Sequence, residues 1–246
     1  TLKGLAVVCT AASAVLSLAR LPLRASFLTG GNWQSATDTI MLTMVAESPL
    51  GTSITLRLVG LGLICAILIP GRSGRWLAVL GAVIVAASFA FRGHALGEPR
   101  FLLGLLITLH ILGLAFWIGA FTPLYRNAGG ETGSTAHEFG RKALWVVGAL
   151  TFVGAGTLWI LSGGVLEALF TPYAQFFAIK LFLFLAVMGF AAWNKLRLTP
   201  ALLRAERDAC AKLRQSIRLE SALIGAVLIT TAAMTTLSAP VAFDQS

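Results

Sequence analysis

Seven runs of apolar residues, separated by short polar segments, divide the chain along its length. Each run is long enough for a helix to cross the roughly 30 Å hydrocarbon core of a bilayer at about 1.5 Å per residue. A membrane barrel would instead show strands of alternating polarity about ten residues long. The pattern therefore predicts an all-α transmembrane helix bundle, with spans at 4–21, 53–70, 76–93, 101–125, 143–162, 174–194 and 216–237.

The connections between most spans are short, so we expect one transmembrane domain over residues 1–246. The longest connection is 22–52, in which 33–47 has helical potential and is followed by the breaker cluster 48–51. This segment is expected outside the cytoplasm, with an interfacial helix. The connection 195–215 is basic and polar, and we expect it to extend the neighbouring helices into cytoplasmic water.

Composition supports a membrane protein and excludes a disordered chain or a typical soluble enzyme. Hydrophobic residues make up 57% of the chain, charged residues only 12%, and mean hydropathy is +0.84. The three cysteines, Cys9, Cys65 and Cys210, show neither CxxC nor zinc spacing, so no disulfide framework is expected. A net charge of +9 suggests nucleic acid as a partner in a soluble protein. Here the charges lie in short loops, and we expect membrane lipid rather than nucleic acid as the partner.

The distribution of lysine and arginine predicts the orientation of the bundle. One side carries thirteen of them: Lys3, Arg72, Arg75, Arg126, Arg141, Lys142, Lys195, Arg197, Arg204, Arg207, Lys212, Arg214 and Arg218. The other side carries four: Arg20, Arg24, Arg92 and Arg100. Because positive loops stay in the cytoplasm, the N-terminus of this chain is predicted to be cytoplasmic and its C-terminus to lie outside.

Four ionisable side chains fall inside predicted spans, where such groups are costly and often functional. His110 lies about 14 Å into its span at helical rise, near the bilayer midplane. Arg57 and Lys180 lie nearer the outer ends, where they either reach the interface or bind internal oxygen atoms. Glu220 lies near the inner end of the last span, and pairing with Arg218 or a loop cation is the favoured interpretation.

Soft metal ligands gather on the predicted outer half of the bundle. His94 closes the third span and His110 follows after a short reversal, so the two can face each other on adjacent helices. Met41 and Met44 share a helix face in the outer segment, and Met234 lies near the outer end of the last span. Imidazole with thioether suits copper, Cu(I) more than Cu(II). Taken singly, a methionine in a membrane bundle is usually packing material, and a histidine is as often a hydrogen-bond donor as a ligand.

Several phrases in order resemble the copper resistance protein D family of bacterial inner-membrane proteins. They are Leu56-Arg57, Gly93-His94-Ala95, Leu109-His110, Phe116-Trp117-Ile118-Gly119-Ala120, Pro123-Leu124, Phe139-Gly140-Arg141, Thr171-Pro172-Tyr173, Lys180, Asn194-Lys195, Thr199-Pro200 and Arg218-Leu219-Glu220. The resemblance covers roughly 50–240 and is weak over 22–52. Members usually carry a further N-terminal span, so one span is expected to be missing from this chain.

The resemblance implies copper handling at the inner membrane, usually from periplasm to cytoplasm, with a periplasmic copper-binding partner. It agrees with the outward soft ligands and with the lack of any hydrolytic triad, phosphate-binding loop or HExxH motif, so no enzyme is expected. Two alternatives remain open. The first is a b-type haem redox protein ligated by the histidine pair. The second is a scaffold that delivers copper to another protein without transport. The sequence does not fix the oligomeric state.

Overall fold

A computed structural model describes residues 2–92, 99–126, 132–161 and 172–237. Every secondary-structure element in those ranges is a helix, which confirms the all-α class. The chain divides into two compact units. The N-terminal unit contains residues 1–114 and 150–157, and the C-terminal unit contains 115–149 and 158–246. The helices α5 (Arg100–Arg126) and α6 (Thr132–Leu161) each contribute to both units.

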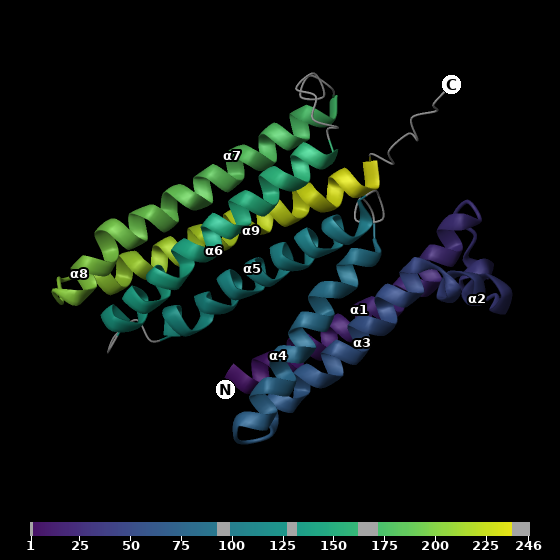
Figure 1. Cartoon of the computed structure of the whole chain (residues 1–246), viewed down its shortest axis with the longest axis horizontal. Helices are drawn as coiled ribbons and strands as arrows, with labels where there is room; N and C mark the ends of the chain where they lie inside the picture. The colour runs from purple at the N-terminus through teal and green to yellow at the C-terminus, as the bar shows by residue number, and fades with distance from the viewer. Residues whose placement is uncertain (1, 93–98, 127–131, 162–171, 238–246) are drawn as a thin grey trace. The chain divides into compact units, whose positions relative to one another are not determined.

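Three long helices form the body of the N-terminal unit, and α3 packs against both α1 and α4 (Figure 1). The short helix α2 contacts α1 and α3 where the first ends and the second begins. The elements before α5 are α1 (Leu2–Leu28), η1 (Trp33–Ala36), α2 (Thr39–Glu47), α3 (Pro49–Ile64), η2 (Cys65–Leu68), α4 (Arg72–Ala87) and η3 (Ser88–Phe91).

Local capping explains why the segment after α1 folds into a short separate helix. Asp38 accepts hydrogen bonds from the backbone N–H groups of Ile40 and Met41 at 2.8 and 3.0 Å, which starts α2. Ser48 then caps α3, with Pro49 at its first position. α1 itself runs through Pro22 to Leu28, beyond the predicted end of the first span.

A pair of glycines allows α3 and α4 to pack closely. A Cβ atom on Gly60 would lie 2.7 Å from the carbonyl oxygen of Gly81, and one on Gly81 would lie 2.5 Å from the carbonyl oxygen of Gly60. These neighbours are backbone atoms, so no side-chain rotation can make room for a methyl group. Small residues commonly mediate such close helix contacts in membranes.

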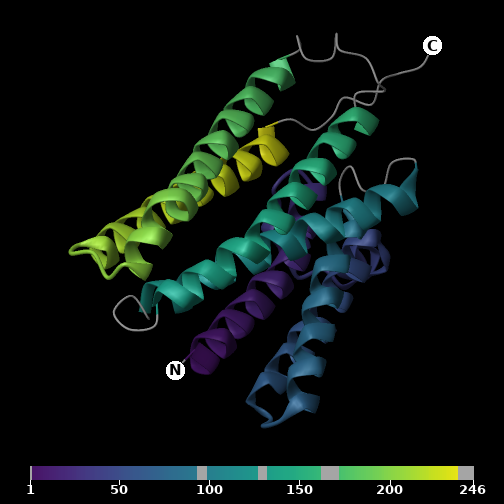
Figure 2. The same ribbon diagram turned by 60° about the vertical axis from the view of Figure 1, so that its left-hand side comes forward.

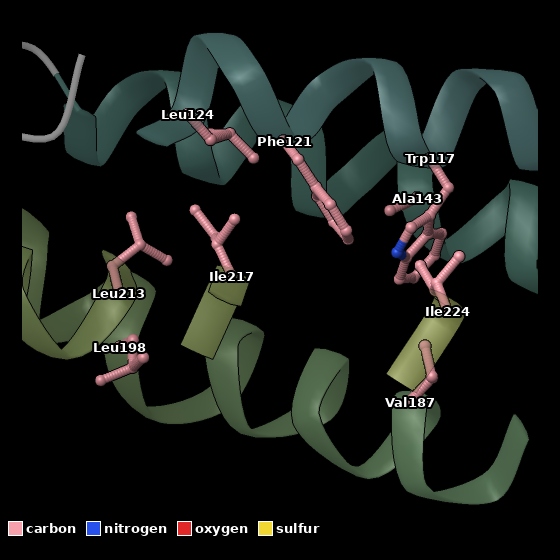
Figure 3. Packing of buried hydrophobic residues seen from close by; sticks show 9 residues of the cluster. All are labelled: Trp117, Phe121, Leu124, Ala143, Val187, Leu198, Leu213, Ile217 and Ile224. Atoms are coloured by element: carbon pink, nitrogen blue, oxygen red, sulfur yellow. The ribbon is translucent and has the colours of Figure 1, made fainter. Parts of the chain in front are cut away.

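The C-terminal unit is built mainly from α7 (Pro172–Trp193) and α9 (Ala209–Leu237), which lie side by side in both ribbon views (Figures 1 and 2). Residues from α5 and α6 complete its hydrophobic core. Figure 3 shows the core side chains converging from these helices. The core consists of Trp117, Phe121, Leu124, Ala143, Val187, Leu198, Leu213, Ile217 and Ile224.

The predicted polar connection 195–215 is largely helical. α7 continues into a π-helix, η6 (Asn194–Leu198), and then into α8 (Thr199–Leu203). The chain reverses over residues 204–208 before α9 begins. Ala205 and Asp208 have φ angles of 52° and 66° there, in the left-handed region that non-glycine residues rarely adopt.

Five helical segments within the described residues are long and apolar enough to cross a membrane. They are Leu2–Leu28, Pro49–Leu68, Arg72–Phe91, Arg100–Arg126 and Leu181–Leu203. They overlap five of the predicted spans, while 143–162 and 216–237 fall in α6 and α9, so the count of seven stays a prediction. Large apolar side chains such as Phe101, Phe152 and Phe182 are strongly exposed. Such an exterior suits lipid as the surrounding solvent.

Candidate functional site

The two methionines of the outer segment lie on α2. Met41 is half-buried and Met44 is exposed, and the spacing of three residues keeps them on neighbouring positions of one helix face. Gly51, at the start of α3, brings that helix so close to α2 that a Cβ atom would overlap the carbonyl oxygen of Ala46. α2 is therefore held firmly at the end of the N-terminal unit by its Asp38 cap and by α3.

The other predicted ligands are described to different extents. His110 is half-buried on the part of α5 that belongs to the N-terminal unit, and His94 lies outside the described residues. Met234 and Lys180 lie on α9 and α7, but their side chains are outside the described part of the chain. Among the described residues, no three His, Cys, Asp or Glu side chains form a group that could hold a metal ion.

Arg57 faces the interior of the N-terminal unit and is only 9% exposed. Its Nε and Nη2 atoms donate hydrogen bonds to Ser88 Oγ at 3.2 and 3.1 Å, and its guanidinium carbon lies 4.3 Å from the centroid of the Phe89 ring. Ser53 on α3 donates a hydrogen bond to the Ser88 carbonyl at 2.7 Å, so both contacts join α3 to the start of η3. Of the two interpretations left open by the sequence for Arg57, the internal oxygen partner is the one that the structure shows.

Two further arginines, Arg20 and Arg92, lie near Arg57. Arg92 also approaches the Phe89 ring, at 5.9 Å, and both Arg57 and Arg20 are close enough to repel its charge. Among the described residues, neither Arg57 nor Arg92 forms a salt bridge with a carboxylate. The resulting positive potential disfavours the passage of a cation through this part of the unit.

Replacing Ser88 with alanine is expected to lower the free energy of unfolding by about 2 kcal/mol, because the buried guanidinium of Arg57 loses its oxygen acceptor. Ser17→Ala is the matched control. Ser17 is also buried, but its hydroxyl only donates to the Ser13 carbonyl within α1, so a loss of about 1 kcal/mol or less is expected. Denaturant titration of the purified protein in mixed micelles measures both. Equal losses of unfolding free energy in the two variants would show that the Arg57–Ser88 contact does not stabilise the protein.

A second polar cluster surrounds Glu220 in the C-terminal unit. Glu220 lies on α9 and is 2% exposed. Asn194, the first residue of the π-helix, donates a hydrogen bond from Nδ2 to Glu220 Oε1, and Ser216 Oγ lies 3.5 Å from the same oxygen. The indole N–H of Trp117 on α5 lies close enough to this carboxylate to interact with it. It makes no hydrogen bond of normal geometry with any described residue.

The expected pairing of Glu220 with Arg218 is wrong. Arg218 donates to the hydroxyl of Tyr125 at 2.6 Å, and Arg214 and Arg218 both approach the Tyr125 ring. The interpretation failed because residues two positions apart lie on nearly opposite faces of a helix, so Glu220 faces the core while Arg218 faces outward. The sequence signal for the true partner is the single amide of Asn194 directly after the apolar run of α7.

These observations define the class of protein: an all-helical protein with segments suited to cross a membrane and a few buried polar contacts between helices. The model of the family Copper resistance protein D matches residues 133–234, and that of the Copper resistance protein D-like N-terminal domain matches residues 1–99. The chain belongs to the copper resistance protein D family. No curated protein and no solved structure matches it. It is therefore a membrane protein related to copper resistance.

Proposed function

We propose that this protein binds copper at the periplasmic face of a bacterial inner membrane and moves it into the cytoplasm. The family membership is the observation that carries this proposal. Copper is the substrate, and no enzymatic reaction is involved. The proposal includes the seven-span topology, with thirteen basic side chains on the cytoplasmic side and four outside.

The ligand chemistry supports copper over harder metals. Met41 and Met44 would capture the ion on α2, which joins the end of α1 to the start of α3 on the predicted outer side. His94 and His110 would bind it next, with Met234 as a further thioether ligand. Thioether and imidazole groups favour Cu(I), whereas zinc and magnesium gain little from thioether. Exchange between several weak sites also allows an ion to leave again.

The arginine cluster of Arg20, Arg57 and Arg92 limits the route. Because these side chains repel cations, copper would pass along the face of α5 that carries His110 rather than past Ser88. We also propose a periplasmic copper-binding protein as the donor, as the family resemblance implies, because an exposed methionine such as Met44 can exchange ligands with a partner.

The test is copper bound per purified chain, measured by mass spectrometry, together with copper accumulation by cells that express the protein. The His94→Ala/His110→Ala double variant is expected to lose most bound copper and the accumulation that depends on it. His137→Ala is the matched control, because His137 is exposed near the start of α6 and outside the proposed route. Binding should favour Cu(I) over Zn(II) and weaken at acid pH as imidazoles protonate.

Wild-type accumulation in the double variant would overturn the proposed site. Copper binding without uptake into sealed vesicles would favour the alternative function, a scaffold that delivers copper without transport. A strong Soret band with one iron per chain would instead establish the haem alternative.

A further inference from the structure

The cluster around Glu220 contains a carboxyl group that is buried among neutral partners. Its neighbours come from three elements: Trp117 from α5, Asn194 from η6, and Ser216 from the preceding turn of α9. Trp117 is 4% exposed and packs in the core of the C-terminal unit, where Figure 3 shows its ring nitrogen among apolar side chains. Water therefore has little access to this carboxyl group.

The described charged side chains on the packed elements contact groups other than Glu220. On α9, Arg214 and Arg218 lie against Tyr125. On α6, Lys142 pairs with Glu138 at 2.7 Å. The remaining ionisable groups near these elements are exposed at the surface: Arg126, His137, Arg141, Lys195, Arg197, Arg204, Glu206, Arg207, Asp208 and Lys212. No described cation therefore balances an ionised Glu220, and burial disfavours an unpaired charge.

Two buried polar atoms in the cluster have no hydrogen-bond partner among the described residues: Oδ1 of Asn194 and Nε1 of Trp117. One is an acceptor and the other a donor. A protonated Glu220 has an O–H group that can donate a hydrogen bond to Asn194 Oδ1, once the side-chain amide of Asn194 has rotated by about 180°. An ionised Glu220 accepts instead from Asn194 Nδ2 and from the Trp117 N–H. Each unpaired atom is thus complementary to one protonation state of the carboxyl group.

The backbone at Asn194 is also unusual. A π-helical turn begins there, and Thr199 Oγ1 donates to the Asn194 carbonyl at 3.0 Å. Such turns are rare in proteins, and those that occur are often found at functional sites. The wider turn directs the Asn194 amide toward α9, where it reaches Glu220 across 26 positions of sequence.

We propose that Glu220 is a proton-binding site, with Asn194 and Trp117 as the acceptor and donor that complement its two states. On binding, a proton from water forms an O–H bond with the carboxylate, and on release the proton returns to water, with no oxidation or reduction. Ser216 remains a hydrogen-bond donor in both states. The proposal does not depend on copper, and its test uses copper-free protein, so it can fail or succeed separately from the transport proposal.

The test is infrared difference spectroscopy of the purified full chain, titrated with acid and base in lipid nanodiscs. The wild type is expected to show the C=O band of a protonated, buried carboxyl group that disappears as the pH rises. Glu220→Gln should lose this band. Glu138→Gln is the control and should keep it, because the hydrogen bond from Lys142 lowers the pKa of the Glu138 carboxyl and its side chain is exposed.

Trp117→Phe provides a second test that leaves the carboxyl group in place. Loss of the indole donor removes a partner of the ionised form, so the midpoint of the band's titration should move to higher pH. Trp145→Phe, which alters an exposed indole on α6, should leave the midpoint unchanged. A band that persists in Glu220→Gln, a carboxylate that stays ionised throughout, or an unmoved midpoint in Trp117→Phe would each overturn the proposal.

Discussion

Gly60→Ala is expected to lower the free energy of unfolding by about 2–3 kcal/mol, although alanine favours a helix by about 1 kcal/mol over glycine. The added methyl group would meet the Gly81 carbonyl oxygen at 2.7 Å and the Val85 backbone nitrogen at 2.9 Å. Because both are backbone atoms, α3 and α4 must move apart. Denaturant titration in mixed micelles measures the change, and Gly60→Leu should prevent accumulation of folded protein.

Gly62→Ala is the matched control, two residues further along the same helix. A Cβ atom there has no neighbour within 4 Å, so the helix propensity of alanine acts alone and stability should stay the same or rise. If both substitutions changed stability equally, the close approach of α3 to α4 would not depend on Gly60.

Reporter fusions are expected to give opposite results at the two turns that flank the proposed spans. Alkaline phosphatase fused after Gly31 should be active, because the turn after α1 is predicted to lie in the periplasm. The same enzyme fused after Ala205, in the turn before α9, should be inactive, while green fluorescent protein at that position should fluoresce. The physical reason is the excess of basic residues retained in the cytoplasm.

A C-terminal phosphatase fusion serves as an internal check, since α9 is predicted to return the chain to the outer side, where the enzyme should be active. Inactive phosphatase after Gly31 together with active phosphatase after Ala205 would invert the orientation. The proposed direction of copper movement would then have to be inverted as well.

Hydropathy predicted the helices well, because polar groups are costly to bury in lipid and each span must therefore be a continuous apolar run in the sequence. The apolar runs 53–70 and 76–93 correspond to Pro49–Leu68 and Arg72–Phe91. The helix ends were less predictable, because caps and polar helical turns carry no hydropathy signal. α1 continues through Pro22, beyond the predicted end of its span. The helical extension after Trp193 was expected from the polar connection, but the π-helical form of its first turn was not.

The polar contacts between helices were harder to predict, because each joins residues distant in sequence. The position of Arg57 in a span left two alternatives, the interface or an internal oxygen partner. Its actual partner, Ser88, is 31 positions away and resembles any other serine in the sequence. For Glu220, the nearest cation in sequence suggested a partner, whereas helix geometry selected Asn194. The proposed copper ligands remain predictions, since His94 and the side chain of Met234 lie outside the described residues.

The two left-handed residues in the turn at 204–208 have a practical consequence for engineering. A non-glycine residue costs about 1–2 kcal/mol in this conformation, and glycine adopts it without that penalty. Ala205 is exposed, so its side chain contributes little packing to offset the cost. Glycine at this position would give a more stable parent protein, in which variants of the buried Glu220 cluster could be purified despite a loss of packing energy.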